Sequence, residues 1–260
     1  MIYPNPSSNN QDAVVNLQKH VVLNVPRERW LQAQRWEGDL WKSVNRPLRN
    51  AAKRVLQQIG LRTREVGDDW NHWWAERLDR YQFVPSHVEN AIEFGCGPYT
   101  NLRLISNGRT IDHAYCSDPL LHIYLNFRYT WLSESYRRQR VLVDDHPMEQ
   151  CPFASDFFDL VVLINVLDHV HDASDCLRQA VRVTKPGGLL IVGQDLTSEE
   201  DLALPEVRSD IGHPIRVDHQ TLDMFLQPTF RPILYRILSR DDGREPLAHY
   251  GTYLFAGSKG

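Results

Sequence analysis

The feature that most constrains this chain is an apolar segment that runs directly into closely spaced glycines. Residues 88–94 are mostly apolar, Gly95 and Gly97 follow, and residues 99–106 have the pattern of a helix start. A strand, a glycine turn and a helix bring backbone close to a ligand, because glycine lacks a Cβ and tolerates unusual φ angles. The free N–H groups at the helix start add donors. The segment predicts a ligand-binding turn.

The acidic residue before the glycines narrows the class of ligand. Glu93 begins a Glu-x-Gly-x-Gly pattern, which is neither the dinucleotide Gly-x-Gly-x-x-Gly nor a phosphate loop. A carboxylate here disfavours a bare phosphate and suits a cationic group such as an amino-acid ammonium or a sulfonium. Taken alone, the segment also fits an ordinary tight turn between a strand and a helix.

The rest of the chain alternates strands and helices. We expect strands at residues 111–117, 141–143, 157–164 and 189–194, and helices at 120–138 and 173–184. This alternation predicts an α/β fold with a doubly wound, mostly parallel sheet. Two further strands, 233–239 and 250–256, are joined through an Asp-Gly turn and predict an antiparallel C-terminal hairpin.

The N-terminal third has a different pattern. Helices are expected at 27–43, at 48–59 before Gly60, and at 68–81 with Asp68 or Asp69 as N-cap, and six of the seven tryptophans precede residue 75. We expect residues 1–85 to form a leader and a tryptophan-rich helical lid. Residues 86–260 would form the main domain, with an acceptor-side insert at 195–230. The tryptophans either pack the lid onto this domain or line an acceptor pocket.

Composition excludes several classes of function. The 260 residues are 42% hydrophobic and 24% charged, as in a soluble globular protein. The net charge of −4 disfavours a broad nucleic-acid or membrane-surface role, and no apolar run is long enough to span a membrane. The polar first ten residues do not resemble a signal peptide, and the four cysteines have no Cys-x-x-Cys spacing. We expect a cytoplasmic protein with reduced thiols.

Two acidic positions fit a nucleoside. Asp118 follows Gly97 by 21 residues (118 − 97) and ends the next strand, where an acid can accept from both ribose hydroxyls. Alternatively, it caps the following helix in an Asp-Pro turn. After strand 141–143, an aspartate could accept from an adenine amino group while Met148 packs on the ring. A polar surface loop is the alternative there.

Several segments together resemble the class I S-adenosylmethionine-dependent methyltransferases, in the branch that acts on small molecules. They are residues 93–98, 117–119, 151–153, 158–161, 166–170 and the Lys-Pro-Gly-Gly at 185–188, in the order and spacing of that family. The resemblance covers roughly residues 88–195. It implies S-adenosylmethionine as the cofactor and a seven-stranded, Rossmann-like sheet.

The resemblance also implies roles for individual residues. The methionine part of the cofactor would be surrounded by Glu93, Gly95 and Gly97. The ribose would contact Asp118, and the adenine would contact Asp145 and Met148. Cys96, Pro119 and Asn165 adjoin these segments and complete the expected cofactor site. The chain departs from the family pattern at Tyr99, where a third glycine often falls. The loop before Cys151 is longer than usual, which leaves Asp144 as an alternative to Asp145.

Methyl transfer to oxygen or nitrogen also requires loss of a proton, so polar residues near strand ends are the candidate bases. We expect Asp168, His169 and His213 to be catalytic, although each histidine could instead be a capping or structural side chain. A divalent metal bound by Asp168, His169 and His171 is a further alternative. Residues so close in sequence are poorly placed around one octahedral ion, and we therefore expect no metal.

The chemical class of the acceptor is indicated only by a sequence pattern in the expected lid. A pattern of Trp30, Ala33, Gln34, Glu37 and Trp41 is similar to an N-terminal element of some methyltransferases tied to glycan biosynthesis. We therefore expect O-methylation of a sugar or polysaccharide end or of another small polar acceptor. Alternatives are a natural-product hydroxyl or amine, a non-catalytic cofactor-binding scaffold, and a dinucleotide oxidoreductase, which the missing third glycine opposes.

Overall fold

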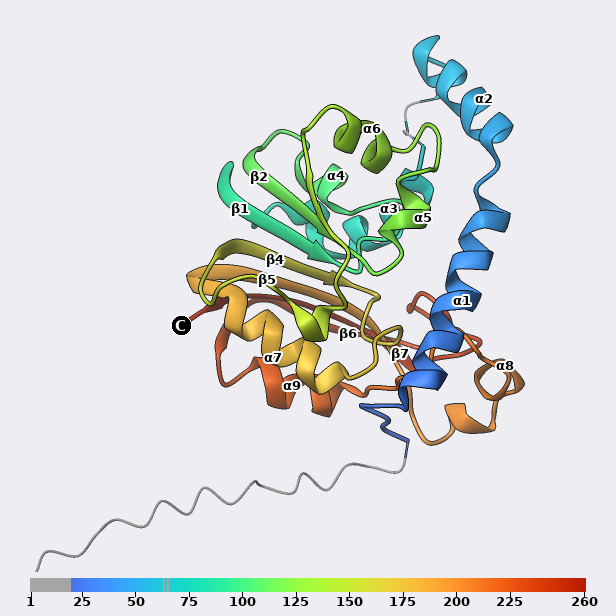
Figure 1. The fold of residues 1–260 in the computed structure, drawn as a ribbon. Helices are drawn as coiled ribbons and strands as arrows, with labels where there is room; N and C mark the ends of the chain where they lie inside the picture. The colour runs from blue at the N-terminus through green and yellow to red at the C-terminus, as the bar shows by residue number, and fades with distance from the viewer. Residues whose placement is uncertain (1–19, 63, 65) are drawn as a thin grey trace, which may run out of the picture.

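The computed structural model, which describes residues 20–62, 64 and 66–260, is built around one seven-stranded sheet (Figure 1). The strands are β1 (His87–Phe94), β2 (Thr110–Ser117), β3 (Leu142–Asp144), β4 (Phe158–Ile164), β5 (Thr184–Leu196), β6 (Phe230–Ser239) and β7 (Gly251–Lys259). Their order is β3-β2-β1-β4-β5-β7-β6. All neighbouring pairs among β1 to β5 are parallel, and β7 is antiparallel to both of its neighbours. The predicted sheet and its reversed hairpin are confirmed.

The strand order creates the position for a ligand. From β1 the chain proceeds outward to β2 and β3, and it then returns to place β4 on the other side of β1. The last residue of β1, Phe94, pairs with Ser117 of β2 and with Leu163 of β4. These three strands therefore end side by side, at the reversal of strand order where open α/β sheets bind ligands.

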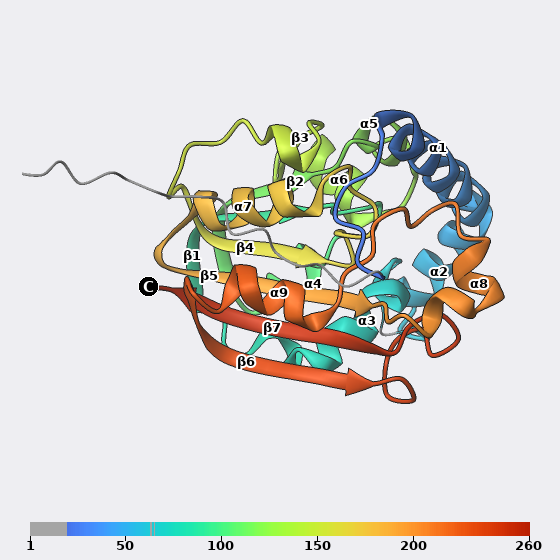
Figure 2. The same cartoon turned by 90° about the horizontal axis from the view of Figure 1, so that it is seen from below.

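Helices cover both faces of the sheet (Figures 1 and 2). One face packs against α7 (Ala173–Val183) and α9 (His219–Leu226), and the other against α3 (Asp68–Arg77), α4 (Leu102–Ile105), α5 (Leu121–Tyr124) and α6 (Trp131–Arg137). Neighbouring strand residues alternate between the two cores, as the pleat requires. Within the described part of the chain, no helix combines the length and the hydrophobicity needed to cross a membrane.

The single helix expected at residues 120–138 is wrong. The chain forms the two short helices α5 and α6, and Tyr129 between them has a positive φ of 64°. Thr130 then begins α6, because its side chain accepts a hydrogen bond from the backbone N–H of Ser133 at 3.2 Å. A threonine N-cap favours a new helix start at this position, so the segment forms two helices instead of one.

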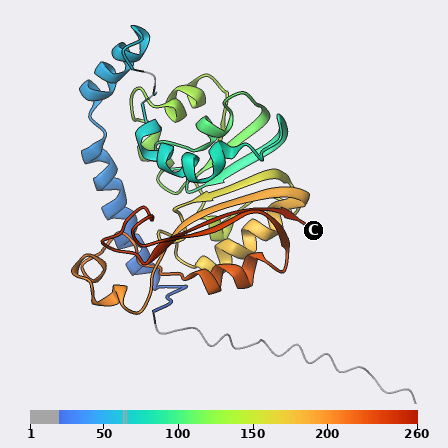
Figure 3. The same cartoon turned by 180° about the vertical axis from the view of Figure 1, so that it is seen from behind.

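The three predicted N-terminal helices are present as α1 (Arg27–Val44), α2 (Pro47–Gln58) and α3, and we call them the lid. Helix α1 crosses the end of the sheet where the parallel strands finish (Figures 1 and 3). The N-cap of α3 is Gly67, at φ 101°, rather than either aspartate that follows it. Before α1, Val22 forms an antiparallel bridge with Arg216 of the segment between β5 and β6. That segment contains α8 (Pro205–Arg208) and α9. Residues 1–19 of the expected leader lie outside the described residues.

Candidate active site

The glycine turn after β1 has the backbone that the sequence predicts. Gly95 and Gly97 have φ angles of 61° and 55°, in the left-handed region that side chains with a Cβ rarely adopt. A Cβ on Gly95 would collide with the side chain of Val166, which follows β4. The glycine is therefore needed both for the turn and for the close approach of two strand ends.

Glu93 holds the segment beyond the turn. Its carboxylate accepts from the backbone N–H groups of Asn101 and Leu102, each at 3.1 Å, from the Asn101 amide at 2.8 Å, and from the Thr100 hydroxyl. The side chain is almost fully buried, and this burial raises its pKa to about 7 although the four hydrogen bonds favour the charged form. Glu93 thus fixes the start of α4 and also lines the cavity described below.

Asp118 closes the other side of the turn from the end of β2. One carboxylate oxygen accepts from the Gly97 N–H at 3.1 Å and the other from the Leu120 N–H at 2.8 Å. Burial raises the pKa of Asp118 to about 6, and the negative charge of Glu37 in the lid adds to the increase. The helix-capping alternative and the ligand-binding role are compatible here, since the carboxylate also faces the cavity.

A cavity lies between the turn and the lid, with a volume of about 1030 Å³ including the part that opens to solvent. Of the sequence-predicted cofactor residues, all but one line it: Glu93, Gly95, Cys96, Gly97, Asp118, Pro119, Met148 and Asn165. Asp145 is exposed and does not line it, whereas the segment His146 to Glu149 does. The alternative residue, Asp144, is bound instead to the Ser117 hydroxyl at 3.0 Å and to His146 at 2.7 Å.

The lid supplies the roof of this cavity. Trp30, Gln34, Glu37 and Trp41 of α1 all line it, at the helical spacing that the sequence shows. The Trp30 indole and the Gln34 amide both donate to the backbone carbonyl of His169, at 3.1 and 3.0 Å. These two bonds attach α1 to the loop after β4. Trp30 therefore both attaches α1 to the main domain and lines the cavity.

Arg244 is a cavity residue that the sequence analysis did not single out. It lies in the connection between β6 and β7, and its guanidinium pairs with Asp195 of β5 at 3.0 Å. The same group lies over the ring of Trp74, 5.6 Å from the centroid. Only the hairpin topology places this arginine beside the other strand ends. The Asp-Gly turn at its position predicted the hairpin but no contact with a ligand.

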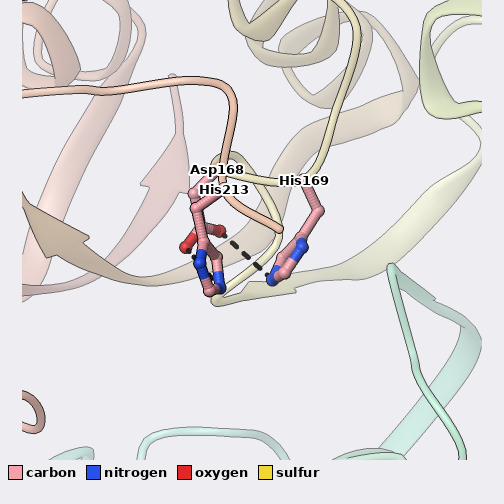
Figure 4. Close-up of side chains that lie close together, drawn as sticks. All are labelled: Asp168, His169 and His213. Carbon is pink, nitrogen blue, oxygen red and sulfur yellow. Dashed lines mark ion pairs between the residues drawn. The ribbon is translucent and has the colours of Figure 1, made fainter. Parts of the chain in front are cut away.

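Asp168, His169 and His213, which we call the wall cluster, lie close together (Figure 4). Asp168 and His169 follow β4, whereas His213 comes from the segment after β5. The two imidazole rings are 4.4 Å apart between centroids. His169 lines the main cavity, and Asp168 and His213 line a smaller one next to it. The cluster therefore forms the wall between the two cavities.

The wall cluster contains side chains of opposite charge, and each shifts the pKa of the other. Burial alone would raise the pKa of Asp168, but positive charge on His169 and His213 outweighs it and lowers the pKa to about 2. Burial would lower the pKa of His213, but a 2.6 Å hydrogen bond to Asp210 and the charge of Asp168 raise it to about 9. At neutral pH, Asp168 is ionised and His213 is protonated.

Comparison with known proteins agrees with this geometry. Residues 92–192 match a family described as "Methyltransferase domain". The N-methyltransferase NodS from Bradyrhizobium japonicum WM9, solved with S-adenosylhomocysteine, is similar in fold, with a TM-score of 0.53, 18% identity, and coverage of 74% of this chain and 90% of that chain. The [4+2]-cyclase SpnF has a TM-score of 0.53 and 16% identity over 74% of this chain and 80% of its own.

A curated relative is similar over a shorter segment. The uncharacterized protein YafE of Escherichia coli (strain K12) is 38% identical over 68 residues, which is 26% of this chain. The match spans about a quarter of that relative, 27% of its length. The family match points to S-adenosylmethionine as the cofactor. The chain thus contains a segment similar to the methyltransferase domain, residues 92–192, and its seven-stranded sheet has the fold of class I S-adenosylmethionine-dependent methyltransferases.

Proposed function

We propose that this protein transfers a methyl group from S-adenosylmethionine to an oxygen of a small polar acceptor, most simply a sugar or the end of a polysaccharide. One observation carries the proposal. The glycine turn, the acid that ends β2 and the polar and aromatic face of α1 all line a single cavity at the reversal of strand order. A cavity of this kind has room for a cofactor and an acceptor together.

For the cofactor, we assign the nucleoside to the side of the cavity formed by the ends of β2 and β3. Asp118 would accept from the ribose hydroxyls, and Met148 would pack against the adenine. The methionine part would lie along residues 95–97, near the buried carboxylate of Glu93. Because Asp145 is exposed, we assign the polar adenine contacts to the neighbouring segment that lines the cavity.

For the chemistry, we assign proton removal to the wall cluster. The methyl group on a sulfonium is already activated, so the protein has to align the acceptor and exclude water. His169 is the member that lines the cavity and is the proposed general base. The raised pKa of His213 makes it a poor base at neutral pH, and we assign it the role of holding Asp168 ionised.

The lining of the lid side favours a polar, hydroxyl-rich acceptor. Trp30 and Trp41 offer aromatic faces of the kind that pack against sugar rings, and Gln34, Glu37 and Arg244 offer polar groups. Glu37 also favours the second candidate, an amine of a natural product, because a carboxylate attracts a cationic acceptor. A non-catalytic scaffold would have no use for the wall cluster. The four free thiols support a reducing, cytoplasmic setting.

The test is methyl transfer itself. A pool of candidate glycans would be incubated with the protein and isotopically labelled S-adenosylmethionine, and the products analysed by mass spectrometry. We expect an acceptor to gain the mass of one CH₂ group, with the label on oxygen. Label on nitrogen would favour the amine candidate. No labelled product from either glycans or amines, in a protein that binds the cofactor, would favour the scaffold.

A further inference from the structure

The wall cluster has the dimensions of a metal site. One ligand atom from each of Asp168, His169 and His213 can be chosen so that all three lie within 4.8 Å of one another (Figure 4). The Asp168 carboxylate lies 3.9 Å from Nε2 of each histidine, one through each oxygen. Ligands about 2.1 Å from an ion lie about 3 to 3.4 Å from each other, so these pairs need to close by less than about 1 Å.

Two buried polar atoms of the cluster lack the hydrogen bonds that buried polar atoms normally make. Among the described residues, Oδ1 of Asp168 and Nδ1 of His169 are buried and have no hydrogen-bond partner. Asp168 is only 6% exposed. A buried carboxylate needs hydrogen bonds, an opposite charge in close contact or a metal ion. The positive charges of His169 and His213 stabilise the ionised carboxylate, but from 3.9 Å, beyond hydrogen-bond distance. An ion between the three side chains would contact the carboxylate directly.

A carboxylate also lies behind each histidine. Asp210 is 2.6 Å from Nδ1 of His213, on the side of the ring away from Asp168. Glu37 of the lid is 3.7 Å from Nδ1 of His169. Metal-binding histidines typically donate from the second ring nitrogen to a carboxylate or carbonyl, which orients the ring and increases its basicity. His213 has this arrangement, whereas His169 has a carboxylate nearby that is not hydrogen-bonded to its ring.

We propose that Asp168, His169 Nε2 and His213 Nε2 bind a divalent transition-metal ion. Two imidazoles and one carboxylate suit zinc or iron better than magnesium or calcium, which prefer oxygen ligands. From the sequence, the alternative was a metal site made of Asp168, His169 and His171, and we expected no metal there. His213 follows His169 by 44 residues (213 − 169), and only the fold brings it to the cluster.

The consequence for catalysis rests on the proposed methyl transfer, whereas metal binding does not. An acceptor hydroxyl bound to the ion would release its proton to solvent more readily, because the metal lowers the pKa of the bound oxygen. The resulting alkoxide would attack the methyl carbon as the bond from that carbon to sulfur breaks, leaving a methyl ether and a neutral thioether. In this form of the protein His169 is a ligand and no longer the base.

The test measures metal binding directly, with Zn²⁺ as the probe. The full chain would be treated with a chelator, dialysed and titrated with Zn²⁺ by calorimetry, and each sample would also be titrated with S-adenosylhomocysteine. We expect one tight Zn²⁺ site in the unaltered protein. Asp168→Asn and His213→Gln should each weaken it more than about 100-fold, and Asp210→Asn, which changes only the outer carboxylate, about 10–100-fold.

His171→Gln is the matched control, since His171 lies two residues from His169 and outside the cluster. It should keep the affinity for Zn²⁺. Surface pairs such as His87 with Asp112 would add a weak background common to all samples. Equal Zn²⁺ affinity in His213→Gln and in the unaltered protein would overturn the proposal, as would the absence of a tight site. If Asp168→Asn fails to fold, His213→Gln decides. A zinc site without methyl transfer would leave this inference standing and refute only the proposed function.

Discussion

The turn side of the cavity, with Glu93 and Asp118, and the wall cluster on its other side, with Asp168, both contain buried carboxylates, but the hydrogen bonding of these carboxylates differs. Every carboxylate oxygen on the turn side accepts a hydrogen bond from residues of its own or an adjacent loop. The wall cluster joins segments more than 40 residues apart (213 − 169 = 44) and leaves two buried atoms without hydrogen bonds. Satisfied groups hold structure, and unsatisfied ones remain available for chemistry. Mutations on the two sides should therefore have different effects.

The largest expected effect separates turnover from cofactor binding. His169→Ala should lower the rate of methyl transfer about 10²- to 10⁴-fold, the usual contribution of a general base, while the affinity for S-adenosylhomocysteine stays nearly constant. Turnover with labelled cofactor and calorimetry would be measured on the same samples. His171→Ala, in the same loop, is the control. A large loss of cofactor affinity with normal turnover would instead show that His169 contacts the cofactor. The proposed difference between the turn side and the wall cluster would then be wrong.

On the turn side, we expect the buried Glu93 to make the free energy of unfolding depend on pH. Burial raises the pKa of Glu93 from 4.5 to about 7, so the folded protein binds this proton more tightly than the unfolded chain. Its contribution to stability is fully present below pH 4.5 and is lost as pH rises through about 7, by at most about 3 kcal/mol. Urea unfolding of the ligand-free protein between pH 4.5 and 8 would measure it.

Glu93→Gln is the comparison variant for this titration. It is less stable at every pH, because one amide oxygen cannot accept all four hydrogen bonds, but it should lack the decline that Glu93 causes. Identical slopes for the variant and the unaltered protein over this range would show that Glu93 titrates alike in the folded and unfolded states. Burial on the turn side would then not raise the pKa of Glu93.

A smaller effect is expected for the ribose contact. Asp118→Ala should weaken binding of S-adenosylhomocysteine by about 1–3 kcal/mol, because ligand hydroxyls and the Gly97 and Leu120 N–H groups lose their acceptor. Asp145→Ala is the matched control, as the exposed acid of the neighbouring loop, and should bind normally. If calorimetry gave the same affinity for Asp118→Ala as for the unaltered protein, the ribose role would be refuted.

The smallest effect concerns the attachment of the lid to the wall. Trp30→Phe removes one hydrogen bond to the His169 carbonyl and leaves the bond from Gln34, so stability should fall by about 0.5–1.5 kcal/mol. The apparent KM for the acceptor should rise more than the affinity for cofactor falls. Trp131→Phe, on α6 and away from the cavity, controls for loss of an indole elsewhere. An unchanged KM would mean that the lid packs without shaping the acceptor site.

The cofactor side could be predicted from sequence because its contacts are local. The turn is encoded by two glycines and an acid within five residues, and Asp118 adjoins it through strand pairing that alternation of strands and helices already predicts. Asp145 illustrates the limit, because a longer loop changes which residue of 144–149 faces the cavity. No local pattern places Arg244 there, and the helical spacing of residues 30–41 groups Glu37 with the tryptophans without showing what that helix face contacts. Their positions follow from a hairpin connection and from the path of α1, which depend on packing of the whole fold.

The most direct test of the central claim is a crystal structure of the protein with S-adenosylhomocysteine. We expect the ribose hydroxyls within hydrogen-bond distance of the Asp118 carboxylate, the amino-acid end along Gly95 to Gly97, and the sulfur facing the side of the cavity that His169 lines. A nucleoside bound elsewhere, or a ribose turned away from Asp118, would contradict the account.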